Sequence, residues 1–383
     1  PTRVSGGSNR SVRQPSIDIL RTLAIALMVV VHFVENLSGA TGLNGGPMAG
    51  AYRHWWLPTG FAAPLFTFLS GVSYHLWLRT QEARNRSDDA ISRATIRRGL
   101  FLFGLGFAFN VLIWLPEDTF NWDILTLLGC ALVALDVARR MPPAVVALAC
   151  GIVVAASPIL RAVADYPAYW SLGYYEYDVA LDDVLLGFLV TGYFPILPWI
   201  AFPLAGFLLA PALFPAPGAA PAGGARPTLL GSALVAAAAL TLLLRPYLPA
   251  DLRPGTSGWT MFPAATTYVF GTLGVTILAT TILSRIADHD GAASRPGAGA
   301  WAGAISRHSL SIYLLHHAIH IWPLWAWGTA MHDNATALWQ RALPASVSLG
   351  LAAVFLVSAA VLFRWMDRNR VPSIESLLRW LCD

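Results

Sequence analysis

Long stretches of this chain carry no charged side chain. They include Leu23–Val34, Gly99–Leu115, Val145–Leu160, Leu229–Leu244 and Val347–Phe363. A helix needs about 20 mostly apolar residues to cross the hydrocarbon core of a bilayer, and each run lies within an apolar segment of about that length. Only 12% of the residues are charged, against roughly 25% in soluble proteins. The sequence therefore predicts an all-α, polytopic membrane bundle and argues against a soluble globular fold.

The apolar runs and their breaks predict about ten transmembrane helices, with nine to eleven compatible with the pattern. The expected spans are residues 17–37, 59–78, 97–116, 122–138, 142–160, 194–214, 228–247, 262–285, 302–326 and 343–365. A further half-helix is expected at 180–194. The chain thus divides into an N-terminal tail at 1–16, a transmembrane domain at 17–365 and a C-terminal tail at 366–383.

The basic residues orient the bundle. All 25 are arginine, and with an N-terminus inside the cell twenty of them fall in the tails and loops of the cytoplasmic side. Because arginine in short loops is retained there, both termini are expected to be cytoplasmic. The absence of lysine beside abundant Ala, Gly and Pro is typical of GC-rich bacterial coding. We therefore expect a bacterial cytoplasmic membrane protein that contacts lipid, and the scattered charge argues against a nucleic-acid partner.

Two expected helices carry polar side chains on a single face, where lipid contact would be costly. Their members lie three, four or seven residues apart, which places them on one stripe of a helix. At 1.5 Å per residue, His32 and the histidines of the ninth span each lie about 20 Å from the cytoplasmic end. They should therefore share a depth near the outer side of the membrane. The stripes are Asp18, Arg21, Met28, His32 and Glu35 in the first span, and Ser306, Ser309, Tyr313, His316, His317 and His320 in the ninth.

These polar residues also admit plainer interpretations. Each histidine of the ninth span can simply bridge helices or lie at the membrane interface, and Asp18 with Arg21 can be a structural ion pair. His316 and His320 have the spacing of a helical metal-ligand pair. No glutamate lies between them and no third ligand is apparent, so no metal site is expected. His308, near the cytoplasmic end, is expected to be solvated.

Five motifs in order resemble one family of membrane enzymes. The residues Ser16–Phe33 (SIDILRTLAIALMVVVHF) and Pro64–Ser73 (PLFTFLSGVS) are similar to the opening spans of the heparan-alpha-glucosaminide N-acetyltransferase family, and also to related membrane acyltransferases that O-acetylate polysaccharides. The further matches are Trp122–Gly129 (WDILTLLG), Phe194–Ile200 (FPILPWI) and Ser306–His317 (SRHSLSIYLLHH). The order and spacing resemble bacterial members over nearly the whole chain.

The resemblance implies transfer of an acetyl group across the membrane, from cytoplasmic acetyl-CoA to an amino sugar or glycan on the far side. It also implies a homodimer. The family's catalysis is attributed to a histidine in the first extracytoplasmic loop, which falls on His54, and to a polar residue at the outer end of the first span, which falls on His32. Around His54 the loop departs from the animal pattern and needs a gap. Imidazole is suited to accept the proton that the acceptor loses.

The donor and acceptor need different side chains at the two ends of such a site. The phosphates of acetyl-CoA suit arginine forks, for which the candidates are Arg21, Asp18 as its orienting partner, Arg307, Arg97 and Arg98. Topology alone also accounts for arginines at these positions. On the outer side, Trp55 and Glu35 are candidates to contact a sugar acceptor, together with Tyr313, His316, His317 and His320.

Two other functions are compatible with the sequence. A transporter or exporter of a sugar or lipid-linked envelope precursor would use the histidine stripes as a proton relay and would not bind CoA. A non-catalytic membrane partner of an envelope enzyme would need neither His32 nor His54. The family motifs favour the acyltransferase.

Overall fold

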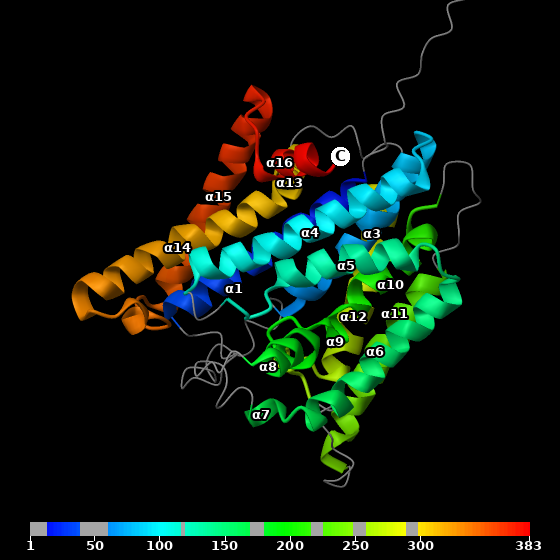
Figure 1. The fold of residues 1–383 in the computed structure, drawn as a ribbon, viewed down its shortest axis with the longest axis horizontal. Helices are drawn as coiled ribbons and strands as arrows, with labels where there is room; N and C mark the ends of the chain where they lie inside the picture. Colours follow the sequence, from blue (N-terminus) through cyan, green and yellow to red (C-terminus); the bar gives the residue numbers. More distant parts are fainter. Residues whose placement is uncertain are drawn as a thin grey trace, which may run out of the picture.

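The computed structural model describes residues 14–38, 60–115, 119–168, 180–215, 225–247, 258–288 and 298–383. In this part of the chain all regular structure is helical (Figure 1). The longer helices are α1 Pro15–Ser38, α3 Ala62–Ala83, α4 Asp88–Ile113, α5 Ile124–Ala138, α6 Pro143–Val163, α10 Ala201–Leu213, α11 Ala225–Leu244, α12 Thr266–Ala287, α13 Ala298–Arg307, α14 Ser309–His332, α15 Ala345–Asn369 and α16 Ile374–Cys382. Short helices are α7 Tyr166–Ala168, α8 Leu181–Leu186 and α9 Ile196–Trp199.

Seven helical segments of the described chain are long and apolar enough to cross a membrane. The all-helical membrane fold predicted from the sequence is thereby confirmed, and a helix lies at each of the ten expected spans. The number of spans remains a prediction. The seven segments are Pro15–Ser38, Asp88–Ile113, Pro143–Val163, Leu181–Leu213, Ala225–Tyr247, Thr266–Ala287 and Ala345–Asn369.

Helix α1 lies at the centre of the bundle. It packs against α3, α12, α13, α14 and α15, whereas α4 packs on α5, α14 and α16 (Figure 1). Helices α6 and α11 lie on one side of α1, and α14 and α15 lie on the other (Figure 1). Apolar side chains on the outer helices are exposed, such as Leu148, Leu243 and Val354. An exposed apolar surface of this kind suits contact with lipid tails.

Small residues let neighbouring helices approach to backbone contact. A Cβ atom at Gly71 of α3 would lie 1.9 Å from the Pro203 carbonyl oxygen of α10, and one at Gly206 of α10 would lie 2.1 Å from the Phe68 oxygen of α3. Gly99 of α4 and Gly129 of α5 face each other in the same way. Tight packing through small residues is a main source of helix association in membranes, so these contacts fix the helices that carry the site.

The ninth expected span, 302–326, is broken near its N-terminal end. Helix α13 ends at Arg307, and α14 starts at Ser309 and continues to His332. His308 at the break is buried, so the expectation that it is solvated was wrong. Its ring stacks on Phe363 at 4.7 Å, and its Nε2 lies 3.0 Å from an Asp367 carboxylate oxygen. The ring nitrogens of His308 therefore lie beside the carboxylates of Asp367 and Glu375 instead of in water.

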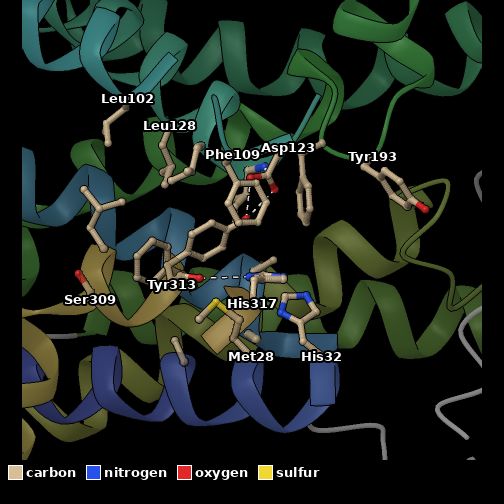
Figure 2. Close-up of a pocket in the computed structure, with 18 of the residues that line it drawn as sticks. Met28, His32, Leu102, Phe109, Asp123, Leu128, Tyr193, Ser309, Tyr313 and His317 are labelled. Carbon is tan, nitrogen blue, oxygen red and sulfur yellow. Dashed lines mark hydrogen bonds between the residues drawn. The ribbon is translucent and has the colours of Figure 1, made fainter. Parts of the chain in front are cut away.

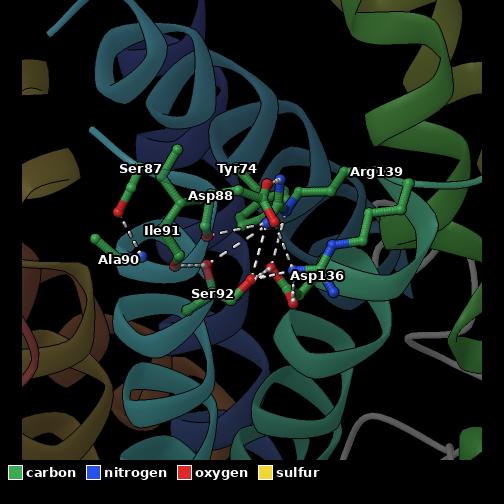
Figure 3. A network of polar contacts seen from close by, with 10 residues as sticks. Tyr74, Ser87, Asp88, Ala90, Ile91, Ser92, Asp136 and Arg139 are labelled. Carbon is green, nitrogen blue, oxygen red and sulfur yellow. Dashed lines mark hydrogen bonds and ion pairs between the residues drawn. The ribbon is translucent and has the colours of Figure 1, made fainter. Parts of the chain in front are cut away.

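A polar network joins the start of α4 to the end of α5 (Figure 3). Arg139 Nε donates to Asp136 at 2.9 Å, and its guanidinium also contacts Asp88. Ser92 donates to the same Asp136 carboxylate at 3.0 Å. The side chains of Asp136 and Arg139 are only 5% and 8% exposed. The network therefore pairs buried charges that would otherwise be costly.

Replacing Asp136 with alanine is expected to destabilise the bundle, because among the described residues it leaves the buried Arg139 guanidinium with the exposed Asp88 as its remaining ionic partner. Breaking a buried ion pair costs on the order of 3 kcal/mol. The measurement is the thermal unfolding midpoint of the purified protein in detergent. The matched control is Asp89→Ala, because Asp89 follows Asp88 in the chain and is exposed. Equal midpoints for the two variants would contradict the role given to Asp136.

Candidate active site

A cavity of about 580 Å³ runs through the centre of the bundle. Its wall takes residues from α1, α3, α4, α5, α14 and α16. One end, here called the arginine end, includes Arg21, Ser73, Arg98, Ser306 and Glu375. The other, the histidine end, includes His32, Glu35, Asn36, His317 and Trp339. Arg21 and His32 are 11 positions apart on α1, which corresponds to about 16 Å along the helix axis.

Arg21 is fixed at the arginine end by two hydroxyl groups. Its guanidinium donates to Ser306 Oγ at 3.2 Å and to Ser73 Oγ. Arg98 lies at the same end, with its guanidinium 4.6 Å from the centre of the Trp77 ring and bonded to the Asp383 carboxylate. Both arginines line the cavity. This end therefore presents guanidinium groups to the cavity, of which that of Arg98 is already paired with a carboxylate.

Helices α1 and α14 bring four histidines together at the other end. His32 Nδ1 lies 3.0 Å from His316 Nε2. The ring centroids of His32 and His317 are 4.6 Å apart, and those of His316 and His317 are 3.9 Å apart. Figure 2 shows His32 and His317 side by side at the cavity, with Met28 one turn before His32 on α1. The shared depth expected from helical rise is thus observed.

The backbone assigns the protons of this cluster. His316 Nδ1 lies 3.0 Å from the Ile312 carbonyl oxygen, and His317 Nδ1 lies 3.1 Å from that of Tyr313. A carbonyl oxygen only accepts, so both Nδ1 atoms donate. In the neutral imidazole the other nitrogen is an acceptor, so His316 Nε2 accepts from His32 Nδ1. The Nε2 atom of His32 then carries a lone pair and, like Nε2 of His317, is able to take a proton at the cavity.

His320 belongs to a separate structural link. Its Nδ1 lies 2.5 Å from the His316 carbonyl oxygen, and its Nε2 accepts from the Asn36 amide at 2.9 Å. The side-chain oxygen of Asn36, Oδ1, in turn accepts from Trp339 Nε1 at 3.4 Å. His320 and His316 are buried and do not belong to the cavity wall. Both residues connect α14 to α1, His316 through His32 and His320 through Asn36.

Asp123 is a polar group of the cavity that the sequence analysis did not select. It lies just before α5 and accepts from Ile124 N at 2.6 Å, and both carboxylate oxygens accept from the Tyr313 hydroxyl, at 2.8 and 2.6 Å. Figure 2 shows this pair across the cavity from α1. The signal available in the sequence was an aspartate directly before an apolar run, which also marks a helix cap.

The remaining selected residues lie in different surroundings. Glu35 and Tyr313 line the cavity, and so does Arg307, which pairs with Asp367. Arg97 is exposed and Asp18 is half-buried, and neither is among the described residues of the wall. His54 and Trp55 lie outside the described residues. The structure therefore groups His32 with His316 and His317, and Arg21 with Arg98.

The fold and the cavity together define an integral membrane protein with a polar site enclosed by its helices and a different charge character at each end. The sequence model of the heparan-alpha-glucosaminide N-acetyltransferase catalytic family matches residues 13–252. The chain belongs to this family, as the motifs indicated, and the family implies an acyltransferase. No curated protein matches the chain. The matched segment contains Arg21, His32 and Asp123, whereas α14 with its histidines lies beyond it.

Proposed function

We propose that the protein transfers an acetyl group from acetyl-CoA, bound at the arginine end, to an amino sugar or glycan at the histidine end. The observation that carries the proposal is the single cavity joining these two ends. With the N-terminus in the cytoplasm, as the arginine distribution predicts, the arginine end faces the cytoplasm. The acceptor side is then extracytoplasmic, and the membrane is the bacterial cytoplasmic membrane.

The donor would bind with its phosphates at the arginine end. Arg21, held by Ser73 and Ser306, presents a fixed guanidinium, and Arg98 lies at the same end. Phosphate oxygens accept well from such forks. The thioester would then reach the histidine end through the apolar part of the cavity, past Met28 and Phe66. The carbonyl carbon and the acceptor would meet beside His32.

At the histidine end the acceptor must lose a proton as it attacks the thioester. His32 would accept this proton at Nε2, while His316 accepts from its Nδ1 and holds the ring. The acetyl C–S bond breaks, CoA leaves as the thiol after protonation, and the acceptor keeps the acetyl group. The family resemblance adds His54 as a second catalytic residue and Trp55 as an acceptor contact. Glu35 at the cavity wall is a candidate to contact the acceptor.

Replacing Arg21 with alanine is expected to weaken acetyl-CoA binding about 10- to 100-fold, because a hydrogen bond to a charged group contributes about 1.5–3 kcal/mol. The measurement is a binding isotherm for acetyl-CoA with the purified protein in nanodiscs. Arg97→Ala is the matched control, since Arg97 is exposed and does not line the cavity, and it should bind like the wild type. A wild-type protein that does not bind any short acyl-CoA would refute the donor assignment and favour a transporter.

A further inference from the structure

The His32, His316 and His317 cluster has the donor set of a transition-metal site. One ring nitrogen of each lies within 4.8 Å of those of the other two. His316 and His317 are almost fully buried. The pair considered from the sequence, His316 with His320, is not the one the fold assembles, because His320 Nε2 is occupied by Asn36. The third ligand, missing from the sequence pattern, comes from α1.

His316 and His317 share a backbone contact with many metal-ligating histidines. His316 and His317 each donate Nδ1–H to a backbone carbonyl oxygen of α14, which is the usual second contact of a metal-bound histidine and leaves Nε2 for the ion. Two nitrogens bound to a tetrahedral zinc ion are about 3.3 Å apart. His32 Nδ1 and His316 Nε2 are 3.0 Å apart, close to this separation, and the rings must turn so that their lone pairs converge on the ion.

We propose that His32, His316 and His317 bind one late first-row divalent ion, with zinc as the reference case. Imidazole nitrogen favours zinc, copper and nickel over magnesium and calcium, which prefer oxygen ligands. Because His32 and His317 line the cavity, the fourth coordination position faces it. Three histidines with one open position are the arrangement of catalytic zinc sites.

Metal binding and the free cluster use different tautomers of His32. In the free cluster His32 Nδ1 carries the proton and donates to His316. With an ion bound, Nδ1 coordinates and the proton moves to Nε2, so no proton is released overall. The metal-bound His32 therefore has no lone pair left to act as a base. The metal-bound cluster and the cluster with His32 as a base are therefore alternative states, and the metal site is proposed independently of the acyltransferase activity.

The test is titration of the tag-free, metal-stripped protein in nanodiscs with Zn²⁺, followed by calorimetry and by metal analysis after desalting. We expect the wild type to bind one ion per chain. The affinity for Zn²⁺ should fall at least tenfold in His316→Gln and in His317→Gln. It should not change in the control His332→Gln, because His332 is an exposed histidine at the end of the same helix. Mg²⁺ should not compete. Co²⁺ should give the visible absorption of a tetrahedral nitrogen site, and this band should disappear in both cluster variants.

Equal zinc affinity in wild type and both cluster variants would overturn the proposal, as would the absence of any stoichiometric binding by the wild type. Thermal unfolding of each variant shows whether it is folded. Where one glutamine variant does not fold, the Co²⁺ spectrum of the other decides. The readouts contain no acyl-CoA, so a negative result leaves the acyltransferase proposal standing, and an inactive enzyme that binds zinc leaves the metal site standing.

Discussion

Replacing His32 with alanine is expected to reduce acetyl transfer by about 100- to 10,000-fold, the usual contribution of a positioned general base. Acetyl-CoA binding should stay close to that of the wild type, because the arginine end lies about 16 Å away along α1. The physical reason is the hydrogen-bond chain from His32 to His316 and the Ile312 carbonyl, which leaves His32 Nε2 as the acceptor. The measurement is CoA thiol release with glucosamine as trial acceptor.

The control for this experiment is His75→Ala. His75 is a half-buried histidine of α3 that packs on Phe207 and does not line the cavity. The His75→Ala variant should transfer acetyl groups at the wild-type rate. Transfer at the wild-type rate by His32→Ala would exclude the base role. A parallel loss of acetyl-CoA binding in that variant would instead indicate a disturbed bundle.

The second large effect is expected from narrowing the cavity between its two ends. Ser70 lines the cavity on α3, one turn from Ser73 towards the histidine end. Ser70→Trp places an indole across the path of the thioester arm, so acetyl transfer should fall more than 100-fold, within the range that loss of positioning produces. Ser70→Ala, which leaves the path open, should keep most of the activity.

Two binding measurements distinguish a blocked path from a damaged site. Adenosine 3′,5′-bisphosphate, which lacks the arm, should bind Ser70→Trp as it binds the wild type, whereas acetyl-CoA should bind more weakly. Full acetyl transfer by Ser70→Trp would show that the thioester does not travel through this cavity. Loss of both ligands would point to displacement of Arg21, which bonds to Ser73 in the neighbouring turn.

The helices were predictable because the length of each apolar run indicates the length of the membrane helix that it forms. The depth of a residue also follows from the rise per residue, which is why His32 and His316 could be expected at one level before any contact between them was known. Rotation of a helix about its axis is a different matter. In the first half of α14, histidines occupy positions 316, 317 and 320, and only packing against α1 shows that His317 faces the cavity while His320 bonds to Asn36.

Features that depend on contacts between distant segments were not predictable. The break at His308 depends on Asp367 and Glu375, about 60 positions away in the chain. The same holds for α16, which brings Glu375 and Leu378 to the cavity wall from a segment expected to be a tail. Asp123 was visible in a motif, but its bond to Tyr313 joins two helices that share no sequence pattern.

The apolar middle of the cavity bears on how such a protein keeps its membrane sealed. A water-filled passage from one face of a bilayer to the other would dissipate the ion gradients that the cell maintains. Between the charged and the histidine-bearing ends, the wall consists of side chains such as Met28, Phe66, Leu102 and Leu128. An apolar lining of this kind is unfavourable for water and for hydrated ions. In the proposed reaction, the thioester arm of the donor would enter the same lining because the arm is flexible and uncharged.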